Sequence, residues 1–440
     1  MTTLLPLLLA LLGLLAPRAS APTPTGPSFA ASFEGADSLV AEWVASGRIP
    51  GAVLLVLRDG QGVLAREYGW ARLYEYGDGE YGASAAGESR PSALRRLAEP
   101  TPMTAATVFD LASVTKVMAT TFAVMLLVDR GDLEVDATVS RYLPDFRGGG
   151  KDAITVRHLL THRSGLLQWV PTYYHARDAE AAYAYVRDLP LGWAVGEGRH
   201  YSDLGFMVLG RVVEQVAGMP LDAFVSRELY EPLGLGATGF RRRDAGGSPE
   251  VRPATEGAGS AGAFAATSHG NPYEHRMVHD STFGYLIRGD AHAWDGWRRY
   301  ALSGEVNDGN AWHAFGGVAG HAGLFSTARE LGVLVQLLLD RGARGGRRFV
   351  DAATVDAFLA STGDGQALGW QVPAYAPPGS FAHTGFTGTW VLGVPSQRLA
   401  VVLLTNRQNV GVDARGLYPD VGPLQRAVAE ALLASSVPSR

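Results

Sequence analysis

Stretches typical of β-strands lie near both ends of the chain, and helical periodicity dominates the long region between them. Residues 51–60 (GAVLLVLRDG) and 62–71 (GVLAREYGWA) are apolar runs joined by an Asp-Gly turn, which predicts a hairpin. Residues 389–395 (TWVLGVP) and 398–406 (RLAVVLLTN) predict two further strands. We therefore expect an α+β fold, in which an antiparallel sheet is built from both chain ends, with flanking helices and an inserted, mainly helical region.

The region between these strands predicts the helices of the insert and a cleft beside the sheet. Helical periodicity is found over residues 38–46, 113–130, most of 131–235 and about 423–434. Residues 72–99 and 244–309 have no clear period and predict irregular excursions. A cleft between sheet and insert is a favoured place for a ligand.

The composition excludes several classes of function. The formal net charge of -5 leaves no basic excess for binding nucleic acid. Cysteine is absent, which excludes disulfides, thiolate catalysis and cysteine-based metal sites. A chain of 440 residues that is 47% hydrophobic can bury a large core without such links.

The first residues have the pattern of an export signal. Residues 4–15 form an apolar run too short to span a bilayer, and an A-x-A pattern ends at Ala21. We expect a signal peptide over 1–21, a proline-rich linker over 22–35 and one folded domain over 36–440, with the helical insert at roughly 130–310. The protein is thus expected to be exported to the periplasm or the extracellular space, with no transmembrane span. An uncleaved N-terminal anchor is the alternative, since Pro22 would hinder cleavage.

The chain has only two lysines, Lys116 and Lys151, among 38 basic residues. Lys116 follows Ser113 by three positions, so a helix would bring the amine within hydrogen-bond reach of the hydroxyl. Arginine keeps its proton in proteins, whereas a buried lysine can lose it. Burial and the helix N-terminus are expected to lower the pKa of Lys116 to roughly 7–8, where it can accept the serine proton. The pair predicts nucleophilic catalysis, although a capping serine near a solvated lysine has the same spacing.

Two later stretches place this pair in a wider pattern. HYSDLGFMVLG (200–210) and FAHTGFTGTW (381–390) follow it along the chain. Together they resemble the serine β-lactamase and penicillin-binding-protein superfamily, in which S-x-x-K, then Y-x-N or S-x-N, then K-T-G or H-T-G occur in this order. RHLLTHRSGL (157–166) and GGVAGHAGLFSTA (316–328) are similar to its class C β-lactamase-like branch, which includes D-alanyl-D-alanine carboxypeptidases and esterases.

This resemblance implies a role for each matched residue. Ser113 would be the nucleophile that forms an acyl-enzyme, Lys116 its proton acceptor or relay, and Tyr201 the group that returns a proton to the leaving group. The backbone N–H groups of Ser113 and Phe386 would form the oxyanion hole. The strand that lines the cleft would contribute His383, Thr384 and Gly385. The resemblance implies neither a metal nor an organic cofactor.

The chain departs from the superfamily pattern at two positions. Asp203 stands where asparagine is most common, and an ionised carboxylate beside Lys116 would raise the pKa of the lysine. Either Asp203 is protonated, or it faces away as a helix cap, or Lys116 stays charged and Tyr201 takes the serine proton. His383 stands where β-lactamases usually have lysine and is largely neutral near pH 7. Arg407 is then a candidate for recognition of a substrate carboxylate.

The remaining histidines include two pairs with i,i+4 spacing. His158 and His162 form one pair and His275 and His279 the other, but neither pair has the glutamate of an H-E-x-x-H metal motif. We therefore interpret both pairs as structural. His321, in the stretch GVAGHAG, is expected to be structural or to line the cleft.

The combined pattern predicts an exported serine hydrolase that acylates Ser113, most simply a D-alanyl-D-alanine carboxypeptidase of the penicillin-binding type. A carboxylesterase or weak class C-like β-lactamase on the same site is the first alternative. A non-catalytic penicillin- or peptidoglycan-binding module is the second. The expected partner is a D-amino-acid peptide, an ester or a β-lactam, and the chain is expected to be a monomer.

Overall fold

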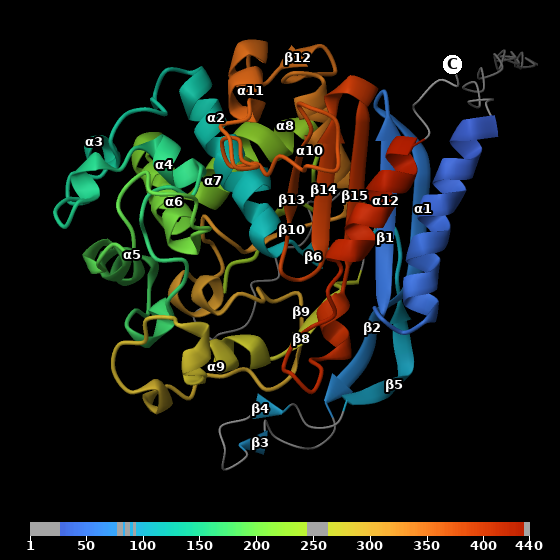
Figure 1. Cartoon of the computed structure of the whole chain (residues 1–440), viewed down its shortest axis with the longest axis horizontal. Helices are drawn as coiled ribbons and strands as arrows, with labels where there is room; N and C mark the ends of the chain where they lie inside the picture. The colour runs from blue at the N-terminus through green and yellow to red at the C-terminus, as the bar shows by residue number, and fades with distance from the viewer. Residues whose placement is uncertain (1–26, 77–81, 84–88, 91–93, 244–262, 435–440) are drawn as a thin grey trace, which may run out of the picture.

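The computed structural model describes residues 27–76, 82–83, 89–90, 94–243 and 263–434, and the proposed signal peptide lies outside these ranges (Figure 1). A six-stranded sheet, antiparallel at every pairing, combines strands from both chain ends, as the sequence predicts. Its strands are, in order across the sheet, β13 (Phe381–Thr384), β14 (Thr389–Val394), β15 (Leu399–Thr405), β1 (Gly51–Arg58), β2 (Gln61–Tyr76) and β5 (Leu94–Pro102).

Part of the range 72–99 is strand, so the expectation of an irregular excursion there is wrong. β2 continues to Tyr76, and β5 pairs with it from Leu94 onward. Most side chains of β5 are exposed or half-exposed. A strand at the edge of a sheet, facing water, does not need the apolar run by which central strands are recognised in a sequence.

Helices cover both faces of the sheet, which explains why its central strands are apolar throughout (Figure 1). On one face α1 (Pro27–Ala45) and α12 (Gly422–Ala434) pack on each other and on the sheet, and α10 (Ala328–Leu339) packs on the other face. Successive residues of β15 point to opposite faces. Leu403 therefore belongs to the core under α1 and α12, and Val402 to the core under α10. The helix α1 begins at Pro27, inside the range 22–35 predicted as a linker.

The helix expected over 113–130 is present as three consecutive helical segments. They are η1 (Ala112–Val114), η2 (Lys116–Thr121) and α2 (Phe122–Asp129), and they end before Gly131 as predicted. Within the described ranges, Ala112–Asp129 is long and apolar enough to cross a bilayer, contrary to the expectation from the sequence. Asp203–Ala217 and Leu221–Leu233 together are also long and apolar enough, but they are bent relative to each other. Ala112–Asp129 is 83% buried inside the fold, as core helices are.

The region between the two sets of strands is mainly helical. Its helices are α3 (Val139–Tyr142), α4 (Val156–Leu160), α5 (Ala179–Asp188), α6 (Asp203–Ala217), α7 (Leu221–Val225), α8 (Glu231–Leu233) and α9 (Pro272–His279); α11 (Ala352–Leu359) follows later. The short strands are β6 (Phe109–Asp110), β7 (Gly239–Phe240) and β10 (Leu324–Ser326) in one sheet, and the pairs β8 (Ala266–His269) with β9 (Ala301–Ser303), β3 (Gly82–Ala83) with β4 (Ser89–Arg90), and β11 (Ala343–Arg344) with β12 (Arg347–Arg348).

The small sheet β6-β10-β7 brings the start of the 113–130 helix next to the loop that precedes β10. The backbone N–H of Leu111 donates to the carbonyl of Leu324 over 3.0 Å. Thr115 accepts a hydrogen bond at Oγ1 from the N–H of Leu324 over 3.1 Å. Residues from two distant parts of the chain therefore meet around Ser113.

Candidate active site

Ser113 follows a backbone turn that a non-glycine residue rarely adopts. Ala112 has a φ of 45°, in the left-handed region, and its N–H donates to Asp110 Oδ1 over 2.8 Å. Such a conformation costs about 1–3 kcal/mol and persists only where its surroundings hold it. Ser113 is half-buried, whereas the neighbours on either side of it are buried. The turn thus presents one hydroxyl at the start of a buried helix.

Lys116 is fully buried, and its ammonium group contacts three oxygen atoms. Nζ lies 2.8 Å from Ser113 Oγ, 3.1 Å from the carbonyl oxygen of His321 and 2.7 Å from Asp203 Oδ1. The expected contact between the serine hydroxyl and the amine is therefore present. An ammonium has three protons to donate, so this set of partners suits the charged form of the lysine.

The expectation that the pKa of Lys116 is lowered toward neutrality is wrong. Burial does lower the pKa, but the negative charge of Asp203 and the hydrogen bonds to Asp203 and Tyr201 outweigh it, and the pKa lies above the ordinary value for lysine. The same surroundings raise the pKa of Tyr201, mainly through burial and against the opposing charge of Lys116. Near neutral pH the site therefore contains an ammonium and a neutral phenol.

Asp203 neither faces away nor caps the helix, and its ion pair with Lys116 agrees with the part of the third arrangement in which the lysine stays charged. The helix α6 is capped by Ser202, whose hydroxyl accepts from the N–H of Gly205 over 3.1 Å. The N–H of Asp203 donates to the carbonyl of Gln168 over 2.9 Å, and its side chain faces Lys116. Asp203 is thus an ion-pair partner of the lysine and does not cap the helix.

Tyr201 lies against both members of the pair. Lys116 and Ser113 both act to lower the pKa of its hydroxyl, and Lys116 Nζ lies 5.0 Å from the centre of its ring. The ring of His162 lies 4.4 Å behind it, centre to centre, and His162 Nδ1 accepts from the N–H of Ser202 over 3.0 Å. His162 therefore supports the tyrosine from inside the helical region.

The H-T-G stretch lies on β13, an edge strand of the large sheet, and packs against the residues just before Ser113. Thr387 and Thr389 donate from Oγ1 to the carbonyls of Asp110 and Leu111 over 2.8 and 2.9 Å. A Cβ at Gly385 would lie 2.3 Å from the carbonyl oxygen of Leu111, so only glycine fits there. These contacts bring the third motif to the nucleophile, as the resemblance implies.

Thr384 and Phe386, on either side of that glycine, are exposed. Within the described ranges, the N–H of Phe386 has no hydrogen-bond acceptor, which leaves it available to a substrate oxygen. His383 is buried and shares a hydrogen bond between Nδ1 and the Thr384 carbonyl oxygen. Burial, aided by the charge of Lys116, lowers the pKa of His383 to about 3. The histidine is therefore neutral and supplies no fixed positive charge.

Arg407 does not supply this positive charge either, so the expectation that it binds a substrate carboxylate is wrong. Its Nε and Nη2 donate to the carbonyl of Phe386 over 3.0 and 2.7 Å, and its Nη1 donates to the carbonyl of Pro419 over 2.7 Å. All three nitrogens of the guanidinium are thus committed to backbone. Arg407 holds the Phe386 peptide in place.

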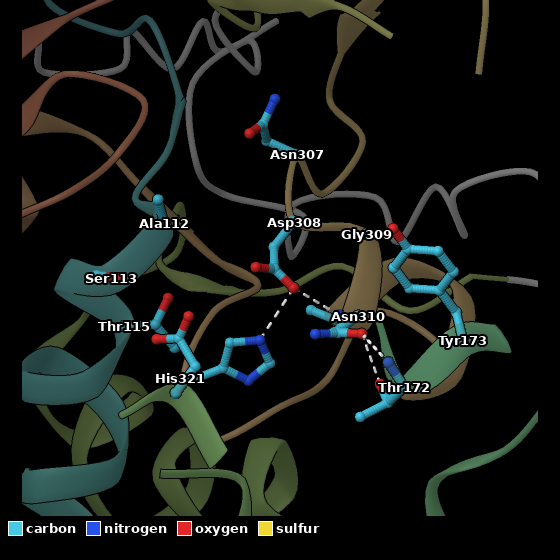
Figure 2. Close-up of polar contacts among 12 residues, drawn as sticks. Ala112, Ser113, Thr115, Thr172, Tyr173, Asn307, Asp308, Gly309, Asn310 and His321 are labelled. Carbon is cyan, nitrogen blue, oxygen red and sulfur yellow. Dashed lines mark hydrogen bonds and ion pairs between the residues drawn. The ribbon is translucent and has the colours of Figure 1, made fainter. Parts of the chain in front are cut away.

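The sequence does not identify Asp308 as a site residue, whereas it predicts that His321 is structural or lines the cleft. Figure 2 shows His321 and Asp308, whose side chains meet through a 2.9 Å contact between Nε2 and Oδ1. His321 is the residue whose carbonyl accepts from Lys116, so the pair is attached directly to the lysine. Asp308 stands before a glycine in a stretch without periodicity, where the sequence signals only a turn.

The two histidine pairs make structural contacts. His158 completes the cap of α4, because its Nδ1 accepts from the N–H of Thr155 over 3.1 Å, and His162 lies behind Tyr201 as described. The rings of His275 and His279 stack 4.0 Å apart on α9. In the first pair, His158 therefore belongs to a helix cap and His162 supports Tyr201. The two rings of the second pair stack on each other within α9.

Comparison with known proteins finds relatives over most of the chain. A family described as Beta-lactamase matches residues 36–422. The N-acetylmuramyl-L-alanine amidase of Bacillus subtilis (strain 168) is 33% identical over 86% of this chain and 81% of its own length. A Salmonella agona (strain SL483) protein provisionally named as a D-alanyl-D-alanine carboxypeptidase is 32% identical over 84% of this chain and 82% of its own length. A penicillin-binding protein homologue from Caulobacter crescentus has the same fold, with a TM-score of 0.61 and 20% identity over 92% of this chain and 97% of that one.

Proposed function

Since the chain belongs to the β-lactamase family of serine hydrolases, we propose that it is an exported D-alanyl-D-alanine carboxypeptidase that forms an acyl-enzyme on Ser113. The observation that carries this proposal is the 2.8 Å contact between Ser113 Oγ and the buried Nζ of Lys116. A serine hydroxyl is a weak nucleophile until a neighbouring group takes its proton. The resemblance of one curated relative, provisionally named as such a carboxypeptidase, supports the choice of substrate.

The contacts of Lys116 support a relay for the serine proton. As Ser113 Oγ attacks the carbonyl carbon, Lys116 passes one proton to Asp203 at 2.7 Å, and the amine lone pair that this frees takes the proton of Ser113. The ammonium charge is thereby kept, which suits a lysine whose pKa is raised. The N–H groups of Ser113 and Phe386 receive the developing oxyanion, a type of contact worth about 3–4 kcal/mol. Tyr201 then protonates the leaving amine and recovers a proton from Lys116, and Lys116 regains a proton from Asp203, so that all three groups return to their starting states.

The experiment is a panel of three substrates with the wild-type protein and with Ser113→Ala. The substrates are a D-Ala-D-Ala peptide, a p-nitrophenyl ester and a β-lactam, and a fluorescent penicillin reports acylation. We expect labelling of Ser113 and release of D-alanine by the wild type only. Labelling without turnover of any substrate would instead identify a binding module, and no labelling with no turnover would refute the enzyme.

A second candidate is an amidase or esterase that does not require a carboxylate on the leaving group. It is favoured by the neutral His383 and by the commitment of Arg407 to the backbone of Phe386 and Pro419. The B. subtilis relative named as an amidase supports this reading to a similar degree. Hydrolysis of diacetyl-L-Lys-D-Ala-D-Ala compared with its C-terminal amide separates the two. A carboxypeptidase cleaves only the acid, whereas the second candidate cleaves both.

The proposal also includes export. The predicted signal peptide over 1–21 supports it. Mass spectrometry of the protein from its native cell envelope tests the idea. A mature N-terminus after Ala21 is expected, whereas an intact N-terminus would identify the uncleaved anchor.

A further inference from the structure

Asp308 presents one carboxylate oxygen without a partner at the site. Its Oδ1 accepts from His321 Nε2 over 2.9 Å and from the N–H of Ala311 over 2.7 Å, so the side chain is held in one orientation. Its Oδ2 has no hydrogen bond or ion pair to any described residue. The side chain is 19% exposed, and Figure 2 shows the free oxygen on the side that faces Ser113. A substrate can therefore reach this oxygen.

The carboxyl group of Asp308 is ionised at neutral pH. Burial alone would raise the pKa of Asp308, but the contact with His321, the N–H of Ala311 and the charge of Lys116 outweigh burial and hold the pKa below the ordinary value. The effect of its charge is seen on Glu274, whose pKa is raised to about 8 by burial and by Asp308. The region thus keeps Glu274 protonated at neutral pH, whereas Asp110, whose pKa is raised to about 6 mainly by burial, adds a second negative charge near Asp308.

The basic groups nearby are already matched to other partners. Lys116 is paired with Asp203 at 2.7 Å. Arg298 donates to Asn271 Oδ1 and to the carbonyls of Val306 and Asn307.

His321 contacts Oδ1 of Asp308 through Nε2 over 2.9 Å, on the side away from Oδ2. Oδ2 therefore remains available to a cation on a ligand.

The side of the scissile bond on which Asp308 lies follows from the proposed function. Tyr201 and Asp203 reach Lys116 from the start of α6, and Tyr201 is assigned to the leaving group. His321 reaches Lys116 from a different element, the loop before β10, and Asp308 is bonded to its ring. The acyl part of the substrate is therefore the part that meets Asp308.

We propose that Asp308 determines substrate specificity by binding an ammonium group on the acyl part of the substrate. This inference rests on acylation of Ser113 and narrows the substrate to amino-bearing acyl donors. A free α-amino group or the side-chain amine of a diamino acid supplies the same chemistry. A charge-assisted hydrogen bond of this kind changes kcat/KM by about 10- to 100-fold.

Two matched substrate series test the proposal. The first compares the p-nitroanilides of D-alanine, N-acetyl-D-alanine and propionic acid, and the second compares Nα-acetyl-L-Lys-D-Ala-D-Ala with its Nα,Nε-diacetyl form. In at least one series we expect the kcat/KM of the wild type to be about tenfold or more higher for the ammonium substrate than for its neutral match. Asp308→Asn should reduce that preference to within about twofold. Asp295→Asn removes an exposed carboxylate from the same region and should keep the preference.

A salt series on the wild type gives a second measurement that needs no variant. Added salt should raise the KM of the ammonium substrate and leave that of its neutral match the same. The inference is overturned if neither series shows a preference for the ammonium substrate. It is also overturned if Asp308→Asn lowers kcat/KM for all substrates by the same factor and so keeps the preference.

Penicillin labelling distinguishes the two levels of the argument. If Ser113 is labelled and esters are hydrolysed but no preference for the amine is found, only this inference is wrong. If there is neither labelling nor turnover of any substrate, the proposed function is wrong as well.

Discussion

The two lysines of the chain occupy contrasting surroundings. Lys116 and Lys151 are both buried, with 0% and 5% of the residue exposed. Lys116 has Asp203 at 2.7 Å, and its pKa is raised. Lys151, in the short helical turn Lys151–Ala153, makes no ion pair to any described residue, and burial lowers its pKa against the more distant charge of Asp188. The comparison shows that a close carboxylate reverses the effect of burial on a lysine.

The same comparison separates two uses of a positive charge. Lys116 is placed where it can exchange protons with Ser113, Asp203 and Tyr201, whereas Lys151 has no ion pair to any described residue and feels only the more distant charge of Asp188. Arg407 is a third case, in which a cation with permanent charge fixes backbone carbonyls. A proton relay needs a group that can give and accept protons, and arginine cannot do so.

The largest effect that would test the contrast comes from replacing each lysine by arginine. Lys116→Arg should lower kcat for a p-nitrophenyl ester by at least about 10³-fold, because arginine keeps the charge and cannot relay the proton. Lys151→Arg is the matched control, and its kcat for the same ester should stay within about twofold of the wild-type value. Steady-state kinetics and penicillin labelling measure both. Retention of a tenth of the activity by Lys116→Arg would mean that the lysine is needed only for its charge.

A smaller loss is expected when the structural cation is changed. Arg407→Leu should lower kcat by about 10- to 100-fold with less effect on KM, because the Phe386 peptide loses its hydrogen bonds and the oxyanion contact loosens. Arg407→Lys retains the charge and has no planar fork to donate to two carbonyls, so it should recover little of the rate. Equal rescue by lysine would indicate an electrostatic role.

Asp203→Asn removes the carboxylate that takes a proton from Lys116 in the proposed relay. It should still preserve acylation and move its pH dependence, because the lysine, with its pKa lowered by burial, then accepts the serine proton directly. Without the carboxylate, burial dominates and the pKa of Lys116 falls, and the pKa of Tyr201 loses one of the charges that raise it. Whichever group takes the serine proton, the rising limb of kcat/KM against pH moves to lower pH, by about 1–3 units. Ester hydrolysis from pH 5 to 10 measures the shift. A loss as complete as that of Ser113→Ala would show that Asp203 is itself essential.

The smallest effect concerns stability. The pKa of Lys151 is lowered in the folded protein, so its charged form destabilises the fold at neutral pH, and that cost disappears as pH rises through its folded pKa. Lys151→Gln should therefore raise Tm by about 1–2 °C at pH 7, with a smaller gain at high pH. Thermal unfolding followed by circular dichroism checks this. A lower Tm for the variant at pH 7 would indicate a favourable contact of the ammonium.

Much of the fold could be predicted from local patterns. The hairpin of β1 and β2, the strands β14 and β15 and the helix α12 follow from apolar runs, turn residues and helical spacing. β5 could not be predicted in this way, because its exposed side chains remove the periodic signal. The helix α1 begins eleven residues before the stretch with clear amphipathic spacing, which starts at 38.

The candidate site divides in the same way. Ser113 and Lys116 are three residues apart, so helix geometry alone predicts their contact, and the order of the motifs predicts Tyr201 and the β13 strand. Asp308 has no such local signal, because its partners Ala311 and His321 are identified only after the loop is folded.

The sequence by itself determined which groups can react: a serine with a lysine one turn away, a tyrosine, a glycine-containing strand and a charged carboxylate in place of an amide. Only the tertiary structure decided the protonation state of the lysine. The oxygens that surround its Nζ come from Asp203 and from His321, the latter 205 positions away in the chain. A pKa depends on the charges and the burial within a few ångströms, and neither quantity is local in a sequence.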